Sequence, residues 1–341
     1  MRHPLFDYAI KATGMSKFFP CETVSNYVAV CSPDIATLNI GDEIIADAVM
    51  KHLTAIFSES VFIKFPTQTH FSSKCINFYN AAAMRFIGGS NLMSSRVRPV
   101  YNQWDISLWN FWKYKSAILM GVGWQKYQSH ADVFAKFFYR PLLSRKYVHS
   151  VRDSYTEGQM RAMGYENVLN TACPTTWDLT PEHCEAIPKT KQKAAVITIT
   201  DYAKDPVSMR KMIEIVRASY EEIYFFQQGV RDLDYLKEVT DPKDIRIISP
   251  TLKAYDKLLD EVHPDFIGTR LHGGIRALQR SCRALIIGID NRAKELSKDI
   301  NLPVVTMDDP EELDRKLHDG WDIALRIPQD KIRKWKNQFQ G

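Results

Sequence analysis

Short apolar runs alternate with amphipathic stretches along most of the chain, and the pattern is most regular in the second half. Buried strands are expected at residues 194–200, 222–227, 244–248, 265–268, 284–289 and 303–306. Amphipathic helices are expected between and after them, at residues 207–220, 232–239, 252–262, 272–282, 293–299 and 310–318. Strands that alternate with helices in this way are typical of a parallel sheet covered by helices.

The first half repeats the pattern less regularly. Strands are expected at residues 27–31, 61–65, 84–87, 116–120 and 147–151, and helices at 42–57, 130–143 and 153–163. Residues 181–193 contain Pro181, Pro188 and several lysines without periodicity, which is typical of a linker. We therefore expect an α/β protein with two doubly wound, Rossmann-like domains that face a cleft, at 1–180 and 194–325, followed by a helical tail at 326–341.

Length and charge agree with this division and exclude several classes of protein. The chain has 341 residues, which favours two domains, and its net charge of +5 is too small to indicate a nucleic-acid partner. The six cysteines form no CxxC motif, so we expect reduced thiols and no metal site. Neither a secretory signal nor a transmembrane segment is expected, which favours a cytoplasmic location. The basic tail around Trp335 leaves peripheral membrane contact open, and no feature specifies an oligomeric state.

The most informative stretch is the end of the strand at 265–268 and the start of the following helix. Arg270 and His272 lie two residues apart, and Gly273 and Gly274 open the helix. A helix N-terminus attracts anions, an arginine binds carboxylate or phosphate, and a histidine can transfer a proton near neutral pH. This combination predicts an anion site with acid–base chemistry. The alternative is a capped turn in which Arg270 forms a structural salt bridge.

Other loops that follow strands or open helices carry weaker signals. Arg152, at the end of a strand, is a second candidate anion clamp, again with a salt bridge as the alternative. The remaining candidates are polar or glycine residues: Asn39, Gly41 and Asp42, then Gly88, Gly89, Ser90 and Asn91, then Gly121 and Gly123. None of these loops completes a GxGxxG motif or a P-loop, so a dinucleotide or Walker-type site lacks support.

Taken together, these motifs resemble the polysaccharide pyruvyl transferase family. The matching stretches are 39–43, 86–92, 121–123, 150–153 and 268–273, with Asp290 and Arg292 where the family tends to have Asp-x-Lys. The resemblance covers nearly the whole chain, and residues 150–153 and 268–273 are its specific parts. One departure is Ala172-Cys173-Pro174, where the family often has Asp-Pro, and it leaves the acceptor open.

The resemblance implies a GT-B-like fold and transfer of a pyruvyl group from phosphoenolpyruvate to two hydroxyls of a sugar. The sugar would belong to a cell-surface polysaccharide or its lipid-linked precursor, and the reaction requires neither a metal nor another cofactor. His272 and Arg270 would be catalytic, in the C-terminal donor domain. Further donor contacts would be Arg152, Leu271, Gly273, Gly274, Asp290 and Arg292. The acceptor side would comprise Asn39, Gly41, Asp42, Gly88, Gly89, Ser90, Asn91, Gly121 and Gly123.

Two other functions fit parts of the same pattern. A GT-B glycosyltransferase with a nucleotide-sugar donor would share the fold and the anion site. No residue clearly marks the carboxylate that would hold its ribose, and Glu295 is the candidate. A glycan-binding protein without activity would share only the fold. The combination of Arg270, His272 and Arg152 argues against the second of these alternatives.

Overall fold

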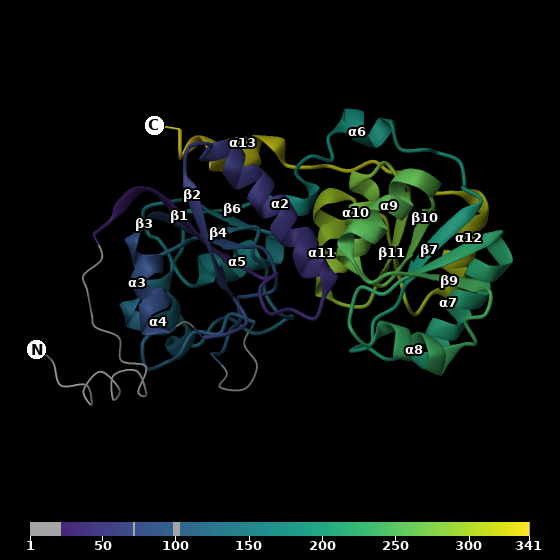
Figure 1. The fold of residues 1–341 in the computed structure, drawn as a ribbon, viewed down its shortest axis with the longest axis horizontal. Helices are drawn as coiled ribbons and strands as arrows, with labels where there is room; N and C mark the ends of the chain where they lie inside the picture. The colour runs from purple at the N-terminus through teal and green to yellow at the C-terminus, as the bar shows by residue number, and fades with distance from the viewer. Residues whose placement is uncertain (1–21, 71, 98–102, 341) are drawn as a thin grey trace, which may run out of the picture.

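A computed structural model describes residues 22–70, 72–97 and 103–340, and it contains two parallel α/β units side by side (Figure 1). The second unit is built on a six-stranded sheet in the order β12-β11-β10-β7-β8-β9. The strands are β7 (Ala194–Thr198), β8 (Glu222–Phe226), β9 (Ile245–Ile248), β10 (Asp265–Gly268), β11 (Ala284–Gly288) and β12 (Val304–Thr306). The strand order reverses between β7 and β10, which is where such sheets bind ligands.

Helices cover both faces of this sheet because its strands are apolar on both sides. They are α7 (Pro206–Ser219), α8 (Asp232–Val239), α9 (Leu252–Val262), α10 (Leu271–Gln279), α11 (Asn291–Ile300) and α12 (Pro310–Asp319). One apolar core contains Tyr255 of α9 and Ile275 of α10, and the other contains Ile213 of α7 and Leu317 of α12. The strands and helices predicted for the second half are all confirmed, with bounds shifted by a few residues at most.

The first unit has a smaller parallel sheet in the order β2-β1-β3-β4. Its strands are β1 (Val24–Ser32), β2 (Val61–Pro66), β3 (Ala82–Gly88) and β4 (Ile118–Met120). A parallel pair, β5 (His149–Val151) and β6 (Val168–Asn170), continues beyond β4 through a single bridge between Val122 and Val151. The helices are α2 (Ile40–Ile56), α3 (Ser73–Ala81), α4 (Val133–Leu142) and α5 (Ser154–Ala162), with 3₁₀ turns η1 (Phe111–Lys113) and η2 (Pro174–Thr176).

Two elements of the first unit were not expected from the sequence, namely α3 and β6. Strand β6 has three residues, which is too short for an alternating pattern to stand out. Helix α3 has the sequence SKCINFYNA, in which Ser and Asn dilute the apolar spacing. A short helix, α6 (Pro181–Glu185), also lies in the stretch predicted as an aperiodic linker. The position of the domain boundary within residues 181–193 stays a prediction.

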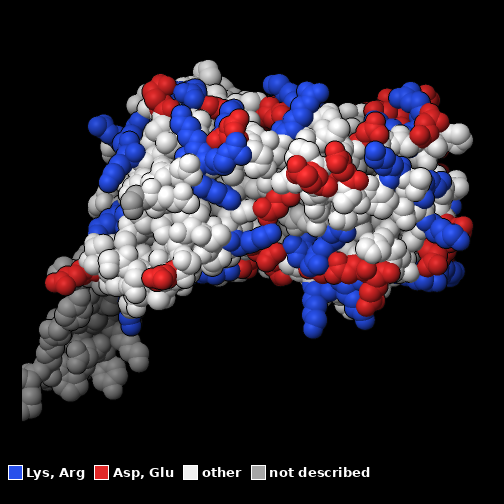
Figure 2. All heavy atoms as spheres, turned by 90° about the horizontal axis from the view of Figure 1, so that it is seen from above, with Lys and Arg blue, Asp and Glu red and all other residues white. Residues whose placement is uncertain are grey.

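The C-terminal tail returns to the first unit as α13 (Gln329–Asn337) (Figure 1). Trp335 of this helix is completely buried, with its ring 5.6 Å from Trp177 and 5.1 Å from Phe339. It is therefore not exposed for contact with a bilayer. Lys331 and Lys334 of α13 are exposed, and Figure 2 shows Lys and Arg gathered on this face of the first unit. None of the described helices has the length and apolar character needed to span a membrane.

Candidate functional site

His272 lies where the two units meet, in the first turn of α10. Helix α10 begins directly after β10, at the point where the strand order of the second sheet reverses. The imidazole is only 4% exposed, and its Nε2 lies 3.9 Å from Sγ of Cys173, which belongs to the loop after β6 in the first unit. Each unit therefore contributes a side chain to this contact.

The pKa of His272 is strongly depressed, to about 3. Burial is the largest cause, because it disfavours the charged imidazolium, and the positive charges of Arg292 and Arg152 act in the same direction. Asp290 opposes this shift. Without a ligand, His272 is thus neutral at physiological pH and lies in a positively charged environment.

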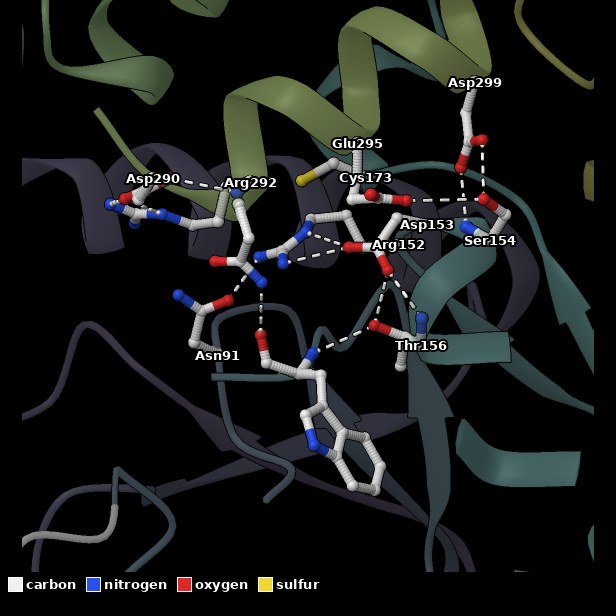
Figure 3. A network of polar contacts seen from close by, with 12 residues as sticks. Asn91, Arg152, Asp153, Ser154, Thr156, Cys173, Asp290, Arg292, Glu295 and Asp299 are labelled. Atoms are coloured by element: carbon white, nitrogen blue, oxygen red, sulfur yellow. Dashed lines mark hydrogen bonds and ion pairs between the residues drawn. The ribbon is translucent and has the colours of Figure 1, made fainter. Parts of the chain in front are cut away.

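Arg152 enters this environment from the end of β5, as the sequence predicts. Its side chain is 1% exposed, and its Nη1 donates a 2.6 Å hydrogen bond to Oδ1 of Asn91 (Figure 3). Its Nε donates to Oδ2 of Asp153 at 3.1 Å, so the predicted salt-bridge alternative is also realised. Gly123 leaves room for the guanidinium, because a Cβ there would lie 2.2 Å from Nη2 of Arg152.

Arg292 and Asp290 contribute to the site from the start of α11. Asp290 caps this helix through a 3.0 Å bond from the Arg292 backbone N–H, and the Arg292 Nε donates to the same carboxylate at 2.9 Å. The hydroxyl of Tyr202 accepts a 2.6 Å bond from Arg292 Nη2. The structure brings His272, Arg152, Arg292 and Asp290 of the predicted donor side together with Asn91 of the predicted acceptor side, and the roles of all five stay predictions.

Arg270 is placed differently from the predicted ligand clamp. Its guanidinium forms a buried ion pair with both oxygens of Asp232, and its Nη2 lies 3.1 Å from Asp201. Gly229 permits this pairing, since a Cβ there would lie 2.1 Å from Arg270 Nη2. The structural salt bridge that the sequence left as the alternative is therefore what the structure shows. Arg270 fixes the loops that surround the start of α10.

The residues next to His272 serve the packing of α10. Leu271 is part of the apolar core, and a Cβ on Gly274 would lie 2.6 Å from Ile286 of β11. A Cβ on Gly273 would lie 2.9 Å from Gln228. These two glycines allow α10 to approach the sheet closely, whereas the sequence suggested that they expose backbone to a ligand. The structure thus gives Leu271, Gly273 and Gly274 a packing role, and the donor contacts predicted for them stay predictions.

Packing and backbone conformation also explain the glycines of the first unit. A Cβ on Gly88 or Gly89 would collide with Val49 or Ile45 of α2, so both let this helix lie on the sheet. Gly121 has a φ of +66° and lies against Pro174. Ser90 has a φ of +62°, and its carbonyl accepts a 2.8 Å bond from the Gly123 N–H. These positions shape the loops around Arg152, and the acceptor contacts predicted for them remain untested.

Asn39 and Gly41 connect the two units. Asn39 Oδ1 accepts hydrogen bonds of 3.1 Å from both the Gly41 N–H and Nε2 of Gln228 in the second unit. A Cβ on Gly41 would lie 2.6 Å from that same nitrogen. The two residues are therefore engaged in a contact between the units, where the sequence placed them on the acceptor side.

Asp42, the third residue of this group, remains close to the charged site. Its carboxylate is 8% exposed and accepts hydrogen bonds through Oδ2 from Thr37 at 2.6 Å and Gln68 at 3.3 Å. Burial raises its pKa to about 6, although these bonds and the charges of Arg292 and Arg270 lower it. Asp42 is thus a group at the junction whose pKa lies near physiological pH, unlike that of His272.

Helix α11 also ties the second unit to the start of α5. The carboxylate of Asp299 accepts 2.6 Å and 2.7 Å bonds from the Ser154 N–H and Oγ (Figure 3). It also accepts a 2.9 Å bond from Asn170. Glu295 accepts a 2.7 Å bond from the Tyr127 hydroxyl. These carboxylates hold α11, and with it Arg292, next to Arg152.

Sequence reasoning missed several residues that shape this junction, chiefly Cys173, Asp232 and Gln228. Cys173 carried a signal, because it lies where the sequence departs from the resembled family. Its sulfur accepts a 3.0 Å bond from the Thr175 hydroxyl. Asp232 and Gln228 belong to no sequence motif. Their contacts become apparent only in the structure, where both follow β8.

Two further observations concern the surroundings of the site. Among the described residues, no group of three or more His, Cys, Asp or Glu side chains is arranged to hold a metal ion. A hollow of about 500 Å³ lies elsewhere, between the α6 region and the segment that leads to α13, and is lined by Pro188, Trp321 and Leu325 among others.

A model of the polysaccharide pyruvyl transferase family matches residues 39–291, a range that contains Arg152 and His272. The comparison with curated proteins returned no match. Among solved structures, the chain is similar to the UDP-GlcNAc 2-epimerase of Methanocaldococcus jannaschii, with 11% identity, a TM-score of 0.49, and coverage of 93% of this chain and 100% of that chain.

Two other solved structures show similarity at the same low level of identity. One is the wall teichoic acid polymerase TagF, with 9% identity, a TM-score of 0.44, and coverage of 98% of this chain and 85% of that chain. The other is UGT71G1 of Medicago truncatula in complex with UDP-glucose, with 8% identity, a TM-score of 0.43, and coverage of 93% of this chain and 94% of that chain.

Proposed function

The chain belongs to the polysaccharide pyruvyl transferase family and is a transferase, and from this premise we propose that it transfers pyruvyl groups from phosphoenolpyruvate to a sugar. The product would be a cyclic ketal that bridges two hydroxyls. The observation that carries the proposal is the position of His272, which is buried beside Arg152 of the first unit and Arg292 of the second.

The donor has two anionic groups, a carboxylate and a phosphate, and the site supplies two arginines from opposite sides. Arg152 Nη2 is buried and makes no hydrogen bond of good geometry to described residues, although it lies 3.0 Å from Asp153. This nitrogen is therefore available to an anionic ligand. Arg292 lies at the start of α11, where the helix dipole adds to its positive charge. Arg270 supports the site indirectly through its ion pair with Asp232.

Proton transfer is the task proposed for His272. Binding of the donor brings negative charge next to the imidazole and offsets the charges of Arg152 and Arg292, so its pKa rises and it takes up a proton. The imidazolium then protonates the methylene carbon of phosphoenolpyruvate, and one sugar hydroxyl attacks the resulting oxocarbenium-like carbon. Loss of phosphate and attack by the second hydroxyl complete the ketal. One hydroxyl proton returns to the histidine, and the other leaves with the phosphate.

The acceptor is proposed to be a sugar of a cell-surface polysaccharide or of its lipid-linked precursor. Asp42 and Asn91 are the members of the predicted acceptor set whose side chains lie beside the arginines. The alternative nucleotide-sugar donor loses support, because Glu295, the carboxylate suggested for a ribose, is bound to Tyr127.

Ligand binding tests the donor without knowledge of the acceptor. Thermal unfolding should be measured with phosphoenolpyruvate, UDP and GDP as separate ligands. Phosphoenolpyruvate at 100 times its dissociation constant is expected to stabilise the protein by about 2.7 kcal/mol, and Arg152→Gln or Arg292→Gln should remove the effect. Stabilisation by UDP or GDP alone would overturn the proposal in favour of a nucleotide-sugar transferase. Phosphate release in the presence of candidate glycans then identifies the acceptor.

A further inference from the structure

An exposed aromatic surface lies on the first unit, formed by the segment around η1 and by the outer face of α4. We call it the aromatic patch and define it as Trp109, Trp112, Val133, Phe134 and Phe137. Trp109 is 86% exposed, Val133 84% and Phe137 60%. Exposed apolar side chains that gather in this way mark interaction sites more often than those scattered singly over a surface.

Aromatic contacts join the two segments of the patch into one surface. Phe111 lies beneath it, with its ring 5.4 Å from Trp112 and 5.7 Å from Phe137. On the opposite face of α4, Phe138 and Tyr139 are buried in the core of the first unit, so aromatic side chains lie on both faces of this helix. Packing among the described residues of the first unit therefore does not account for the exposed aromatic residues.

Positive charges accompany the patch on the same helix. Lys136 and Arg140 are exposed on the outer face of α4, one turn apart. The acidic residue nearest in sequence, Asp132, caps the helix and accepts a 2.7 Å bond from the Ala135 N–H. Aromatic side chains beside Lys and Arg are typical of surfaces that enter the headgroup region of an anionic bilayer.

We propose that the aromatic patch docks this protein on the surface of an anionic lipid bilayer. Aliphatic and phenyl groups such as Val133, Phe134 and Phe137 favour lipid over a sugar chain, because sugar rings need hydrogen-bonding partners beside the stacking aromatic ring. Lys136 and Arg140 provide the attraction to acidic headgroups. The proposal rests on this surface alone and does not use the proposed activity.

The face of α13 supplies an internal comparison. It also exposes two lysines, Lys331 and Lys334, but its tryptophan, Trp335, is completely buried. Figure 1 shows α13 and α4 on opposite sides of the first unit, so one flat membrane does not contact both. If exposed positive charge alone determined membrane binding, the α13 face and the α4 face would compete for the membrane. If aromatic insertion determines it, only the α4 face binds.

Sedimentation with vesicles, without donor or acceptor, tests the proposal on the full chain. The protein should bind vesicles of phosphatidylcholine mixed with phosphatidylglycerol much more strongly than vesicles of phosphatidylcholine alone. Lys136→Gln with Arg140→Gln should weaken binding about 25-fold, at roughly fivefold for each cation. Trp109→Ser with Phe137→Ser should weaken it on the order of tenfold or more. The controls Lys331→Gln with Lys334→Gln, and Val207→Ser on α7, should change it less than about twofold.

A second measurement reports insertion directly. Lipids brominated in the acyl chain should quench the fluorescence of Trp109 and Trp112, and Trp109→Phe with Trp112→Phe should remove most quenching while binding persists. Absence of binding to both kinds of vesicle would overturn the proposal, as would binding that depends on Lys331 and Lys334 instead. Self-association that the patch variants abolish, without vesicle binding, would assign the surface to a second copy and equally overturn it.

Discussion

Nε2 of His272 and Sγ of Cys173 lie 3.9 Å apart although 99 positions separate them in the sequence. His272 belongs to the first turn of α10 and Cys173 to the loop that follows β6, so the contact joins the two α/β units. The site is therefore assembled only when the units are in place. Cys173 is buried, and burial raises its thiol pKa, so the partner of the imidazole is a neutral S–H.

Proton uptake on donor binding is the first consequence. His272 is neutral above its depressed pKa of about 3, and a bound anion beside it raises that pKa. Phosphoenolpyruvate binding near pH 6.5 should therefore take up close to one proton more in the native protein than in His272→Asn. Calorimetry in two buffers of different ionisation enthalpy measures the difference. Equal uptake by the two proteins would contradict the role proposed for His272.

Gly123→Ala should impair donor binding without unfolding the protein. The added methyl group would lie 2.2 Å from Nη2 of Arg152 and force the guanidinium out of position. We expect a loss of phosphoenolpyruvate affinity of at least about tenfold, measured by calorimetry, because a charge-assisted contact is lost. The matched control is Gly158→Ala in α5, where a Cβ meets nothing within 4 Å. It should stabilise the protein by roughly 0.5–1 kcal/mol and leave affinity unchanged.

The periodicity of the sequence was sufficient to predict most of the fold, and the second sheet shows why. Strand β10 and helix α9 have the predicted bounds because continuous apolar runs and a regular helical stripe are strong local signals. Strand β6 has only three residues, and its pairing with β5 depends on contacts that no local pattern records. Local patterns therefore predict long elements well and short ones poorly.

For the site, the sequence indicated which loops carry the charged side chains but not the directions of those side chains. Arg152 and Arg270 both leave a strand end and look alike in sequence. The structure separates them, because Asp232 lies where it can pair with Arg270, whereas Arg152 retains a nitrogen without a well-aligned hydrogen bond. Asp232 belongs to another strand–helix connection, so its pairing with Arg270 depends on the tertiary structure and not on a local sequence pattern. The glycines were ambiguous for a similar reason, since close helix packing and ligand approach require the same missing side chain.

Arg270→Met should reduce stability, which distinguishes the ion pair from a ligand clamp. It leaves the Asp232 carboxylate buried without its cation, and breaking a buried pair costs about 3–5 kcal/mol. Adding Asp232→Asn removes the charge but keeps an acceptor for the 2.7 Å bond from the Gly229 N–H. In urea unfolding, the double variant should therefore recover more than half of the stability that Arg270→Met loses. A single variant that unfolds like the native protein but fails to bind the donor would restore the clamp interpretation.

Asp42→Asn should stabilise the protein at neutral pH but not in acid. Burial raises the pKa of Asp42 from 3.8 to about 6, so the folded state holds a proton more tightly than the unfolded state. Stability is therefore lost as pH rises from about 4 to about 6, and by pH 7.5 the buried charge costs at most roughly 3 kcal/mol. The asparagine variant avoids this cost above pH 6 and should match the native protein near pH 4, which urea unfolding at both pH values measures.

The matched control for this effect is Asp47→Asn on the same helix. Asp47 is 55% exposed and lies 2.9 Å from Arg276, so its removal should change stability by less than about 1 kcal/mol. Asp42 differs because its carboxylate is nearly enclosed, with Thr37 and Gln68 as hydrogen-bond donors. Equal pH dependence of the two variants would mean that Asp42 is hydrated in solution. It would then titrate as an ordinary carboxylate and lose the acid–base capacity near pH 6 that its burial gives it.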